Sequence, residues 1–345
     1  MAAARLKDVA ERAGVSVKTV SNVVRGEARV ADATRRRVLE AIAELDYRPN
    51  TSARRLRTGR SGMIALAVPH LTVGYFAELA TAVLAEAKAA GLTVMIEQTN
   101  GDPEEEFRIA SGAGDPLIDG VILSPLNLDQ SRLVRRERRV PLVLLGERDY
   151  DLSADHVLID NVAAAREATA HMAALGRRRI AAIGVEQPVS ATGRQRLHGF
   201  QLALHEAGLP FDPRLAPVVG EWRRADGAAA MRALLTLPQP PDAVFCFSDL
   251  LAMGAMRAVY EHGVRIPDDV ALAGFDDTEE ARYATPSLTS VSPDKRGLAR
   301  LAVDALLTRI TEPTEHPQVV LHARHTLQVR ESTCRDTNHV ERVSE

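Results

Sequence analysis

Residues 5–24 read RLKDVAERAGVSVKTVSNVV, and this stretch decides the fold of the amino-terminal end of the chain. Apolar residues recur in it at the spacing of one helical face: Leu6, Val9, Ala10 and Ala13. Gly14 ends this first helix, and Ser16 suits the N-cap of a second helix over residues 17–25. Two short helices joined by a tight turn that begins with glycine predict a helix-turn-helix, whose second helix enters the major groove of DNA.

A third helix, over residues 32–45, closes the predicted three-helix core. The residues expected to face this core are Val20, Val23 and Val24 from the second helix and Val38, Leu39, Ile42 and Leu45 from the third. Three arginines, Arg35 to Arg37, crowd the first turn of the third helix, where the helix dipole disfavours cations. A phosphate partner would explain their presence.

Charge is divided unevenly along the chain. The 345 residues carry 43 Lys and Arg against 46 Asp and Glu, a formal net charge of −3 that by itself argues against a nucleic-acid partner. Residues 1–60, however, carry 14 basic and 7 acidic side chains, whereas the other 285 residues carry 29 basic and 39 acidic ones. A basic head on an acidic body is expected when one end binds a polyanion, although a solvated helical face is the alternative that charge alone leaves open.

Length and composition are those of a globular protein with about two to three domains, at the usual ~100 to 200 residues per domain. No stretch reaches the roughly 18 uninterrupted apolar residues of a membrane span, and the first 25 residues lack a signal-peptide core. We therefore expect a cytoplasmic protein. Cys246 and Cys334 lie far apart without metal-binding spacing, which indicates buried structural thiols rather than a disulfide framework.

From Gly62 onward, short apolar runs alternate with helical patterns such as residues 75–90. Strands are predicted at MIALAV (from Met63), LTVMIE (Leu92), GVILS (Gly120), PLVLLG (Pro141), HVLID (His156), RIAAIG (Arg179), PVVGE (Pro217), DAVFCFS (Asp242) and DVALAGFD (Asp269). Nearly continuous apolar strands between helices predict parallel sheets covered on both faces. Because the pattern restarts at residue 179, we expect an α/β fold with two doubly wound lobes and a ligand cleft at the carboxyl ends of their strands.

The motifs of common enzymes on such folds are missing from the sequence. No G-x-G-x-x-G fingerprint follows the strands at Met63 or Arg179, and neither G-x-S-x-G nor H-E-x-x-H occurs. The ten histidines are scattered. We therefore expect no catalytic residues, no metal site and no cofactor. A plain solute-binding protein would fit the body of the chain but not its basic head.

The head resembles a known family through LKDVAERAGVSVKTVSNVV (residues 6–24) and ATRRRVLEAIAELDYRPNTSARRLRTG (residues 33–59). Both segments resemble the DNA-binding head of LacI/GalR-family transcription factors. The resemblance implies that residues 48–60 form a hinge that becomes helical on the operator, with Leu56 wedged into the minor groove. It assigns base contacts to Val17, Lys18, Asn22 and Arg29. It assigns DNA-backbone contacts to Ser16, Thr19, Ser21, Tyr47 and Asn50, with Arg54 and Arg55 neutralising phosphates.

Each of these residues also has a plainer interpretation. Tyr47 could belong to the core, Ser16 and Ser21 could be capping and surface residues, and Leu56 could be part of a linker. The head also departs from the family at Ala31, where a serine usually caps the third helix, so Asp32 or a looser start must open that helix.

The body resembles the same family, and through it the periplasmic sugar-binding proteins, over residues 63–332. The motifs that carry this likeness are YFAEL at Tyr75, VPLVLLGE at Val140, RQRLHGF at Arg194, FSDLLAMGAMRA at Phe247 and GFDDTEEARYATPSLTSV at Gly274. The resemblance implies three crossings between lobes, near Asn161, Val291 and Leu321. The expected parts are a head (1–47), a hinge (48–60), an effector-binding and dimerisation domain (61–335) and a tail (336–345), with an N-lobe at about 62–161 plus 292–320 and a C-lobe at about 162–291 plus 321–335.

Side-chain chemistry in the expected cleft suits a polar ring. Arg196 offers a fork of donors and Asp276 a pair of acceptors, which together match vicinal hydroxyls. Trp222 can stack on the face of a sugar or heterocycle, with Tyr75 and Phe76 opposite. The resemblance adds Ser124, Thr192 and Ser248 as polar contacts, followed by Arg148 and His70. Plainer roles remain open for several of these side chains, since Phe76 could pack a lobe, Trp222 could cap a turn and Asp276 could be a helix N-cap.

Two departures bear on the effector. Ser190 stands where the purine-responsive branch supplies an arginine, which favours a sugar over a purine. Pro293 stands where sugar-responsive members often carry glutamine, which leaves that wall of the cleft undetermined. A nucleoside or another metabolite acting as corepressor is the alternative.

The prediction is therefore an effector-controlled repressor that binds a pseudo-palindromic operator in double-stranded DNA and has no membrane partner. It is expected to act as a homodimer, with the helices at residues 75–90 and 249–262 as candidate contacts.

Overall fold

A computed structural model describes residues 4–24, 30–47, 60–112, 117–134, 140–146, 154–187, 190–312 and 317–334. The chain divides into two compact units, Met1–Ser61 and Gly62–Glu345. Within the described ranges, no helix is both long and apolar enough to cross a membrane.

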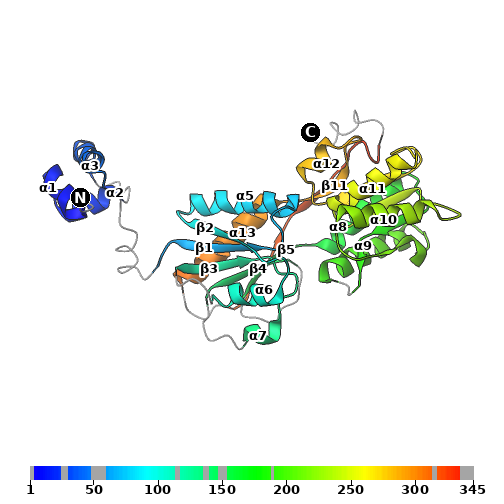
Figure 1. Cartoon of the computed structure of the whole chain (residues 1–345), viewed down its shortest axis with the longest axis horizontal. Coiled ribbons are helices and arrows are strands. Elements are labelled where there is room, and N and C mark those ends of the chain that lie inside the picture. The colour runs from blue at the N-terminus through cyan, green and yellow to red at the C-terminus, as the bar shows by residue number, and fades with distance from the viewer. Residues whose placement is uncertain are drawn as a thin grey trace. The chain divides into compact units, whose positions relative to one another are not determined.

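The first unit is a three-helix head with its own apolar core (Figure 1). Its helices are α1 (Leu6–Ala13), α2 (Val17–Val24) and α3 (Asp32–Glu44). The buried residues are Val9, Ala10, Ala13, Val20, Val23, Val38, Ala41 and Tyr47. Gly14 follows α1 with φ of 64°, the left-handed conformation in which glycine commonly ends helices. The helix-turn-helix prediction is confirmed.

Two expected core residues of the head lie at its surface instead. Val24 is 37% exposed and Leu39 is 51% exposed. Each follows directly after a buried valine and so lies about 100° around the helix from the inward face. Ala41 takes the inward position expected of Leu39.

The second unit begins with a lobe built on a six-stranded parallel sheet in the order β12-β5-β4-β3-β1-β2 (Figure 1). Its strands are β1 (Met63–Val68), β2 (Thr93–Gln98), β3 (Ile118–Leu123), β4 (Leu142–Leu145), β5 (Asp155–Ile159) and β12 (Val320–Ala323). Its helices are α5 (Gly74–Ala89), α6 (Pro103–Ala110), α7 (Gln130–Val134) and α13 (Lys295–Thr311). The helices α5 and α13 pack together on one face of the sheet, and α6 packs on the other.

Alternating side chains on β1 show why both faces must be covered. Ile64, Leu66 and Val68 belong to the core beneath α5 and α13, whereas Ala65 and Ala67 belong to the core beneath α6. Successive side chains of a strand point to opposite faces, so an apolar run buries both sides of the sheet.

The other lobe of this unit is a five-stranded sheet in the order β13-β11-β10-β9-β6. Its strands are β6 (Ile180–Ile183), β9 (Ala243–Cys246), β10 (Ala271–Phe275), β11 (Thr289–Pro293) and β13 (His325–Gln328). Its helices are α8 (Asn161–Ala174), α9 (Ala191–Glu206), α10 (Arg224–Leu235), α11 (Asp249–Glu261) and α12 (Glu279–Tyr283), and Pro213–Leu215 forms a short 3-10 helix. The α/β fold with two doubly wound lobes is confirmed.

Two details of this lobe differ from the predicted parallel sheet. β13 runs antiparallel to β11, because the chain leaves this lobe along β11 and enters it again along β13. The predicted strand at Pro217 is only β8 (Val218–Val219), which pairs with β7 (Val185–Glu186) in a separate two-stranded sheet. This small sheet forms at the edge of the cleft described below.

The chain passes between the two lobes three times. It leaves the first lobe between Ile159 and Asn161, and returns after β11 at the start of α13. It leaves again between β12 and β13. Val291 pairs with Leu327 inside the second sheet, and Leu321 pairs with Val157 inside the first. The second and third crossings therefore fall after the positions predicted for them, because β11 and β12 each extend further.

Close packing of α10 on α11 depends on two glycines. A Cβ at Gly254 would overlap the carbonyl oxygen of Arg224, and one at Gly227 would overlap that of Leu251. Because these obstacles are backbone atoms, the two helices can accommodate a side chain only by moving apart.

We predict that Gly254→Ala lowers the free energy of unfolding by about 1 to 3 kcal/mol, the usual cost of overpacking. Gly220→Ala is the matched control, since its Cβ would meet only Asp226 Oδ1 at 3.7 Å. Urea denaturation followed by circular dichroism measures both variants. Equal midpoints for the two would contradict the proposed close approach.

Candidate functional site

The first turn of α2 presents side chains to solvent. Ser16 caps the helix, because its hydroxyl accepts the Thr19 backbone N–H at 3.1 Å and lies 2.9 Å from Thr19 Oγ1. Val17 is 44% exposed although it is apolar, and Lys18 is exposed beside it. Ser21 and Asn22 are half-buried one turn further on. In a helix-turn-helix this is the turn that meets base edges.

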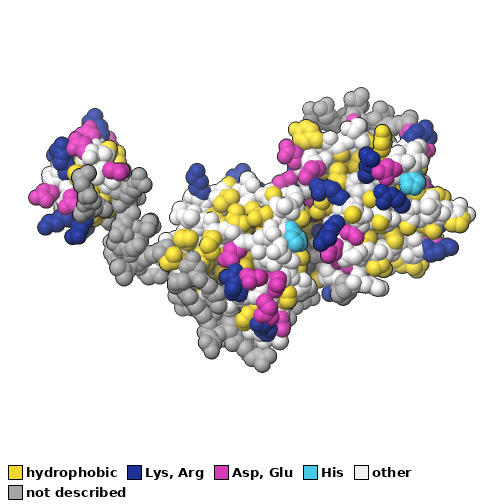
Figure 2. Space-filling model, in the orientation of Figure 1, with side chains coloured by type: hydrophobic (Ala, Val, Ile, Leu, Met, Phe, Trp, Pro, Cys, Tyr) yellow, Lys and Arg dark blue, Asp and Glu magenta, His cyan; other side chains and the backbone are white. Residues whose placement is uncertain are grey.

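The other residues predicted to contact DNA differ in how far they are exposed to solvent. Tyr47 is buried in the core of the head, and its backbone N–H donates to Ile42 O at 3.0 Å. Arg36 and Arg37 are exposed at the start of α3, which has no side-chain cap. Lys and Arg side chains stand out on the face of this unit shown in Figure 2. The predicted contacts outside the described residues are Arg29, Asn50, Arg54, Arg55 and Leu56, with most of the hinge.

The second unit contains a cavity of about 960 Å³ between its two lobes. All eight residues predicted to bind the effector line it: Tyr75, Phe76, Ser124, Thr192, Arg196, Trp222, Ser248 and Asp276. The carboxyl ends of β1, β3, β9 and β10 carry the loops that supply much of this lining, as expected for doubly wound sheets.

Arg196 is a buried cation in the cavity wall. Its Nε donates to Asn161 Oδ1 at 2.7 Å, and its Nη1 donates to Phe247 O. The guanidinium carbon lies 3.4 Å from the centre of the Phe275 ring and 5.3 Å from that of Trp222. Stacking and hydrogen bonds therefore hold this side chain in one orientation beside Asp276.

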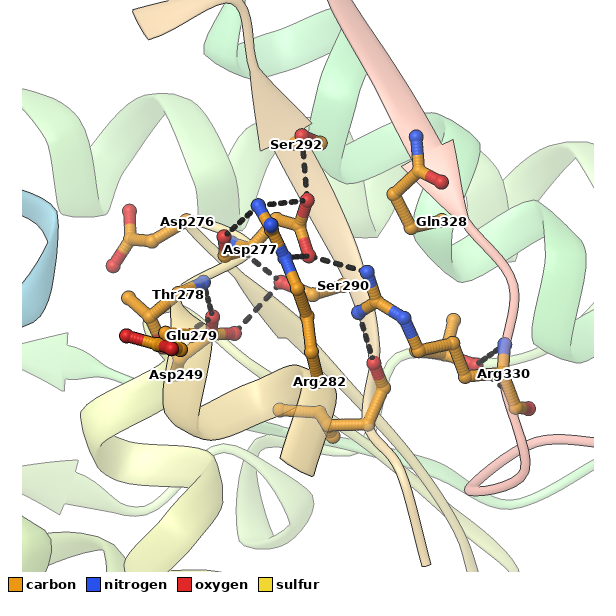
Figure 3. A network of polar contacts seen from close by, with 12 residues as sticks. Asp249, Asp276, Asp277, Thr278, Glu279, Arg282, Ser290, Ser292, Gln328 and Arg330 are labelled. Atoms are coloured by element: carbon orange, nitrogen blue, oxygen red, sulfur yellow. Dashed lines mark hydrogen bonds and ion pairs between the residues drawn. The ribbon is translucent and has the colours of Figure 1, made fainter. Parts of the chain in front are cut away.

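Asp276 lies in a strained turn directly after β10. Its φ is 114° and that of Asp277 is 47°, both in the left-handed region that costs a non-glycine residue of order 1–3 kcal/mol. In Figure 3 the Asp276 carboxylate points away from the polar network behind the turn. It is not a helix N-cap, since Thr278 precedes α12. Burial raises the pKa of Asp276, and the nearby cations Arg196 and Lys295 oppose that rise only in part.

Behind the turn, a network of hydrogen bonds holds the strained backbone (Figure 3). Asp249 accepts the Thr278 backbone N–H at 2.8 Å and the Ser290 hydroxyl at 2.7 Å. Asp277 accepts from Arg330 and from the Ser292 hydroxyl. Burial would raise the pKa of Asp277, but the hydrogen bonds from Arg330 and Ser292 outweigh it and leave that pKa lowered. Burial raises the pKa of Asp249, and the neighbouring Asp276 charge adds to this.

Lys295 links this turn to the first lobe. Its Nζ donates to the carbonyl oxygens of Asp276 and Asp277 and pairs with Glu78 Oε2 of α5 at 2.8 Å. The other carboxylate oxygen of Glu78 accepts the backbone N–H of Glu279 from α12 at 2.9 Å. The two lobes therefore meet through one carboxylate and one ammonium group beside the cavity.

Two of the predicted contacts also have structural tasks. The Trp222 indole N–H donates to Gly184 O at 3.0 Å, and its ring packs edge-on against Phe247. Ser248 is the N-cap of α11, where its hydroxyl accepts the Leu251 N–H at 3.3 Å. Tyr75 and Phe76 pack edge to face with ring centres 5.3 Å apart. These contacts fix the apolar part of the cavity wall.

His70, which the family resemblance also assigns to the effector, lines the cavity as well, whereas Arg148 lies outside the described residues. Four other polar residues of the lining were not predicted: Asn100, Asn127, Glu186 and Glu221. Asn100 and Asn127 come within a few residues of the carboxyl ends of β2 and β3. The rule that ligands bind at these strand ends could have identified them from sequence alone. Glu186 follows β6 in the same way.

Similarity to known proteins identifies the family of this chain. Residues 5–50 match the profile "Bacterial regulatory proteins, lacI family", and residues 169–333 match a "Periplasmic binding protein-like domain". The "HTH-type transcriptional repressor PurR" of Shigella dysenteriae serotype 1 is 35% identical over 327 residues, covering 93% of this chain and 95% of that protein. The chain belongs to the lacI family of bacterial regulatory proteins.

Other lacI-family proteins support the same assignment over nearly the whole chain. The "Ribose operon repressor" of Escherichia coli K12 is 33% identical over 318 residues, covering 91% of this chain and 96% of that protein. A solved structure of the lac repressor dimer bound to operator and the anti-inducer ONPF is 28% identical with a TM-score of 0.78, covering 96% of this chain and 99% of that one. Membership of the lacI family confirms the prediction of a regulator and not an enzyme.

Asp249 gives the fold a measurable pH dependence. The pKa of Asp249 is higher in the folded chain than its ordinary value of about 4, so the folded state holds a proton that the unfolded state has lost. The contribution of Asp249 to stability therefore falls as the pH rises from about 4 towards neutrality, by at most about 1.4 kcal/mol per pH unit.

We expect the stability of Asp249→Asn to fall less with rising pH, because the amide cannot ionise. Urea unfolding at several pH values between about 5 and 8 measures the slope, with exposed Asp304→Asn as control. The wild-type and Asp304→Asn chains should lose stability more steeply with pH than Asp249→Asn. Parallel curves for all three would refute the role of Asp249.

Proposed function

We propose that this protein is a sequence-specific DNA-binding repressor whose operator affinity is controlled by a small molecule bound in the cavity. The observation that carries the proposal is the capped helix α2, which exposes Val17 and Lys18 on its first turn within a head that matches the lacI family. An apolar and a basic side chain on that turn suit contacts to base edges and phosphates. Residues 48–60 are proposed as the hinge, with Leu56 as the minor-groove wedge.

The proposed mechanism is a competition between two arrangements of the lobes. An effector can lower operator affinity only if it binds more tightly to the arrangement that disfavours DNA binding. The cavity is suited to this because its wall includes groups from both lobes. Beside Asp276, Glu78 and Lys295 of the first lobe also contact the backbone of residues 276–279 in the second lobe. A coupling of about 1–3 kcal/mol would alter operator occupancy roughly 5- to 150-fold.

A sugar is the proposed effector, with a nucleoside as the alternative. The paired donor and acceptor of Arg196 and Asp276 and the partly apolar wall around Trp222 support a hydroxyl-bearing ring. Ser190 caps α9 through the Gly193 N–H, which gives this position a structural task in place of a ligand cation. The relative named for the ribose operon is in keeping with a sugar.

The active form is proposed to be a homodimer on a pseudo-palindromic operator, as in the solved lac repressor dimer. The helices α5 and α11 are the proposed contacts. Each carries an exposed large side chain, with Leu84 41% exposed and Tyr260 75% exposed. Such side chains contribute apolar area when two subunits associate.

DNA recognition can be tested by selecting tight binders from random duplexes and measuring affinity by fluorescence anisotropy. We expect affinity for the selected duplex to fall steeply with salt, because each dimer brings two basic heads to the phosphates. Lys18→Ala should weaken binding by about 1–3 kcal/mol, whereas Lys88→Ala in α5 should not. A flat salt dependence, or equal effects of the two variants, would count against the DNA assignment.

The cavity can be tested separately with Asp276→Asn, which removes the charge and leaves the shape. We expect operator affinity to stay unchanged and the effector concentration for half-response to rise at least about tenfold, since hydrogen bonds to charged groups are worth about 1.5–3 kcal/mol. A thermal-shift screen of sugars and nucleosides supplies the effector for the titration. Asp304→Asn is the control, and a normal response in Asp276→Asn would exclude this site.

A further inference from the structure

Glu186 is an acidic residue of the cavity that has no part in the proposed mechanism. It ends the short strand β7 and lines the cavity. Its Oε2 is buried and has no hydrogen-bond donor within the described part of the chain. A Cβ built on Gly193 would lie 3.3 Å from this oxygen, which places the carboxylate beside the first turn of α9. A carboxylate there has the favourable end of the helix dipole, but within the described ranges no Lys or Arg forms an ion pair with it.

The cations around the cavity are already engaged. Arg196 donates to Asn161 and to the Phe247 carbonyl, Arg223 pairs with Glu221, and Arg224 lies 3.4 Å from Glu280. Among the described residues that the first lobe contributes to the lining, none is Lys or Arg. An anionic ligand would therefore have to compete with these acceptors for an arginine, and it would face the carboxylates of Glu186 and Asp276.

An uncharged ligand with hydroxyl groups would find a better match. A carboxylate accepts up to four hydrogen bonds and suits two neighbouring hydroxyls. Trp222 follows β8, the strand that pairs with β7, so an aromatic ring and the Glu186 carboxylate belong to one wall. A carboxylate beside an aromatic ring can bind the hydroxyl edge and the apolar face of the same ring-shaped ligand.

We infer that Glu186 is a specificity-determining residue, which selects an uncharged effector with vicinal hydroxyls over its phosphorylated counterpart. This inference rests on the proposed function of the cavity. The chemistry is shared by a free sugar and by the ribose of a nucleoside. A phosphate on either one adds negative charge to a cavity whose lining already includes the carboxylates of Glu186, Glu221 and Asp276.

The test uses the full chain and matched pairs of ligands. D-ribose is compared with D-ribose 5-phosphate, D-glucose with D-glucose 6-phosphate, and adenosine with adenosine 5′-monophosphate. Isothermal titration calorimetry gives a Kd for each ligand with the wild type, Glu186→Gln and Glu221→Gln. Glu221→Gln is the matched control, because Glu221 also lines the cavity but is exposed and paired with Arg223.

We expect the wild type to bind the uncharged ligand of at least one pair, with a Kd at least about tenfold lower than that of its phosphorylated counterpart. Glu186→Gln should reduce this preference at least about tenfold, chiefly by tighter binding of the phosphate, and Glu221→Gln should not. A wild type that prefers phosphates, an unchanged preference in Glu186→Gln, or no binding of any uncharged member would overturn the inference. The duplex selection decides the regulator assignment independently of these results.

Discussion

The turn after β10 is the constraint on which the rest of the cavity depends. Two successive aspartates adopt positive φ there, and the cost of that conformation must be offset by neighbouring contacts. Asp249 and Ser290 hold the turn from behind, while Lys295 holds its carbonyl oxygens from the first lobe. The same turn aims Asp276 at the cavity. The interlobe contacts and the proposed effector contact of Asp276 therefore share one strained segment.

The net charge of the chain is informative only when it is counted separately for the two compact units. The compact head ends near residue 61, and the excess of basic residues lies before that point. The body is acidic, yet its cavity combines buried carboxylates with an arginine held by stacking. A net charge of −3 thus averages a surface suited to a polyanion and a body that repels one.

Most of the fold could be predicted because its signals are local. Helix periodicity in residues 6–24 and the apolar strand runs from Met63 onward follow from side-chain spacing, which burial enforces directly. The less predictable parts depend on distant segments. β12 and β13 are short, and each becomes a strand through pairing with β5 or β11. Burial of Leu39 and Val24 was also predicted wrongly, because neighbouring residues of a helix point about 100° apart and only one of the two faces the core.

The candidate site shows where residue chemistry succeeds and where geometry is needed. Arg196 and Asp276 were identifiable as a donor and an acceptor, and the structure places both on one cavity wall. Lys295 and Glu78 could not be paired from sequence, because they lie on helices more than 200 residues apart. Glu186 gives no motif either. Its interest comes from a buried carboxylate oxygen that has no hydrogen-bond donor among the residues the structure describes, and no sequence pattern predicts this.

The threefold crossing between the lobes has a consequence for synthesis of the chain. The first lobe needs α13 and β12 to complete its core and sheet, and these segments are synthesised only after β11 of the second lobe. The second lobe waits for β13 in the same way. The head, by contrast, has every core residue within the first 47 positions and can fold as soon as it emerges. A nascent chain can therefore carry a folded head while both sheets still lack edge strands, which leaves backbone groups at those edges unpaired.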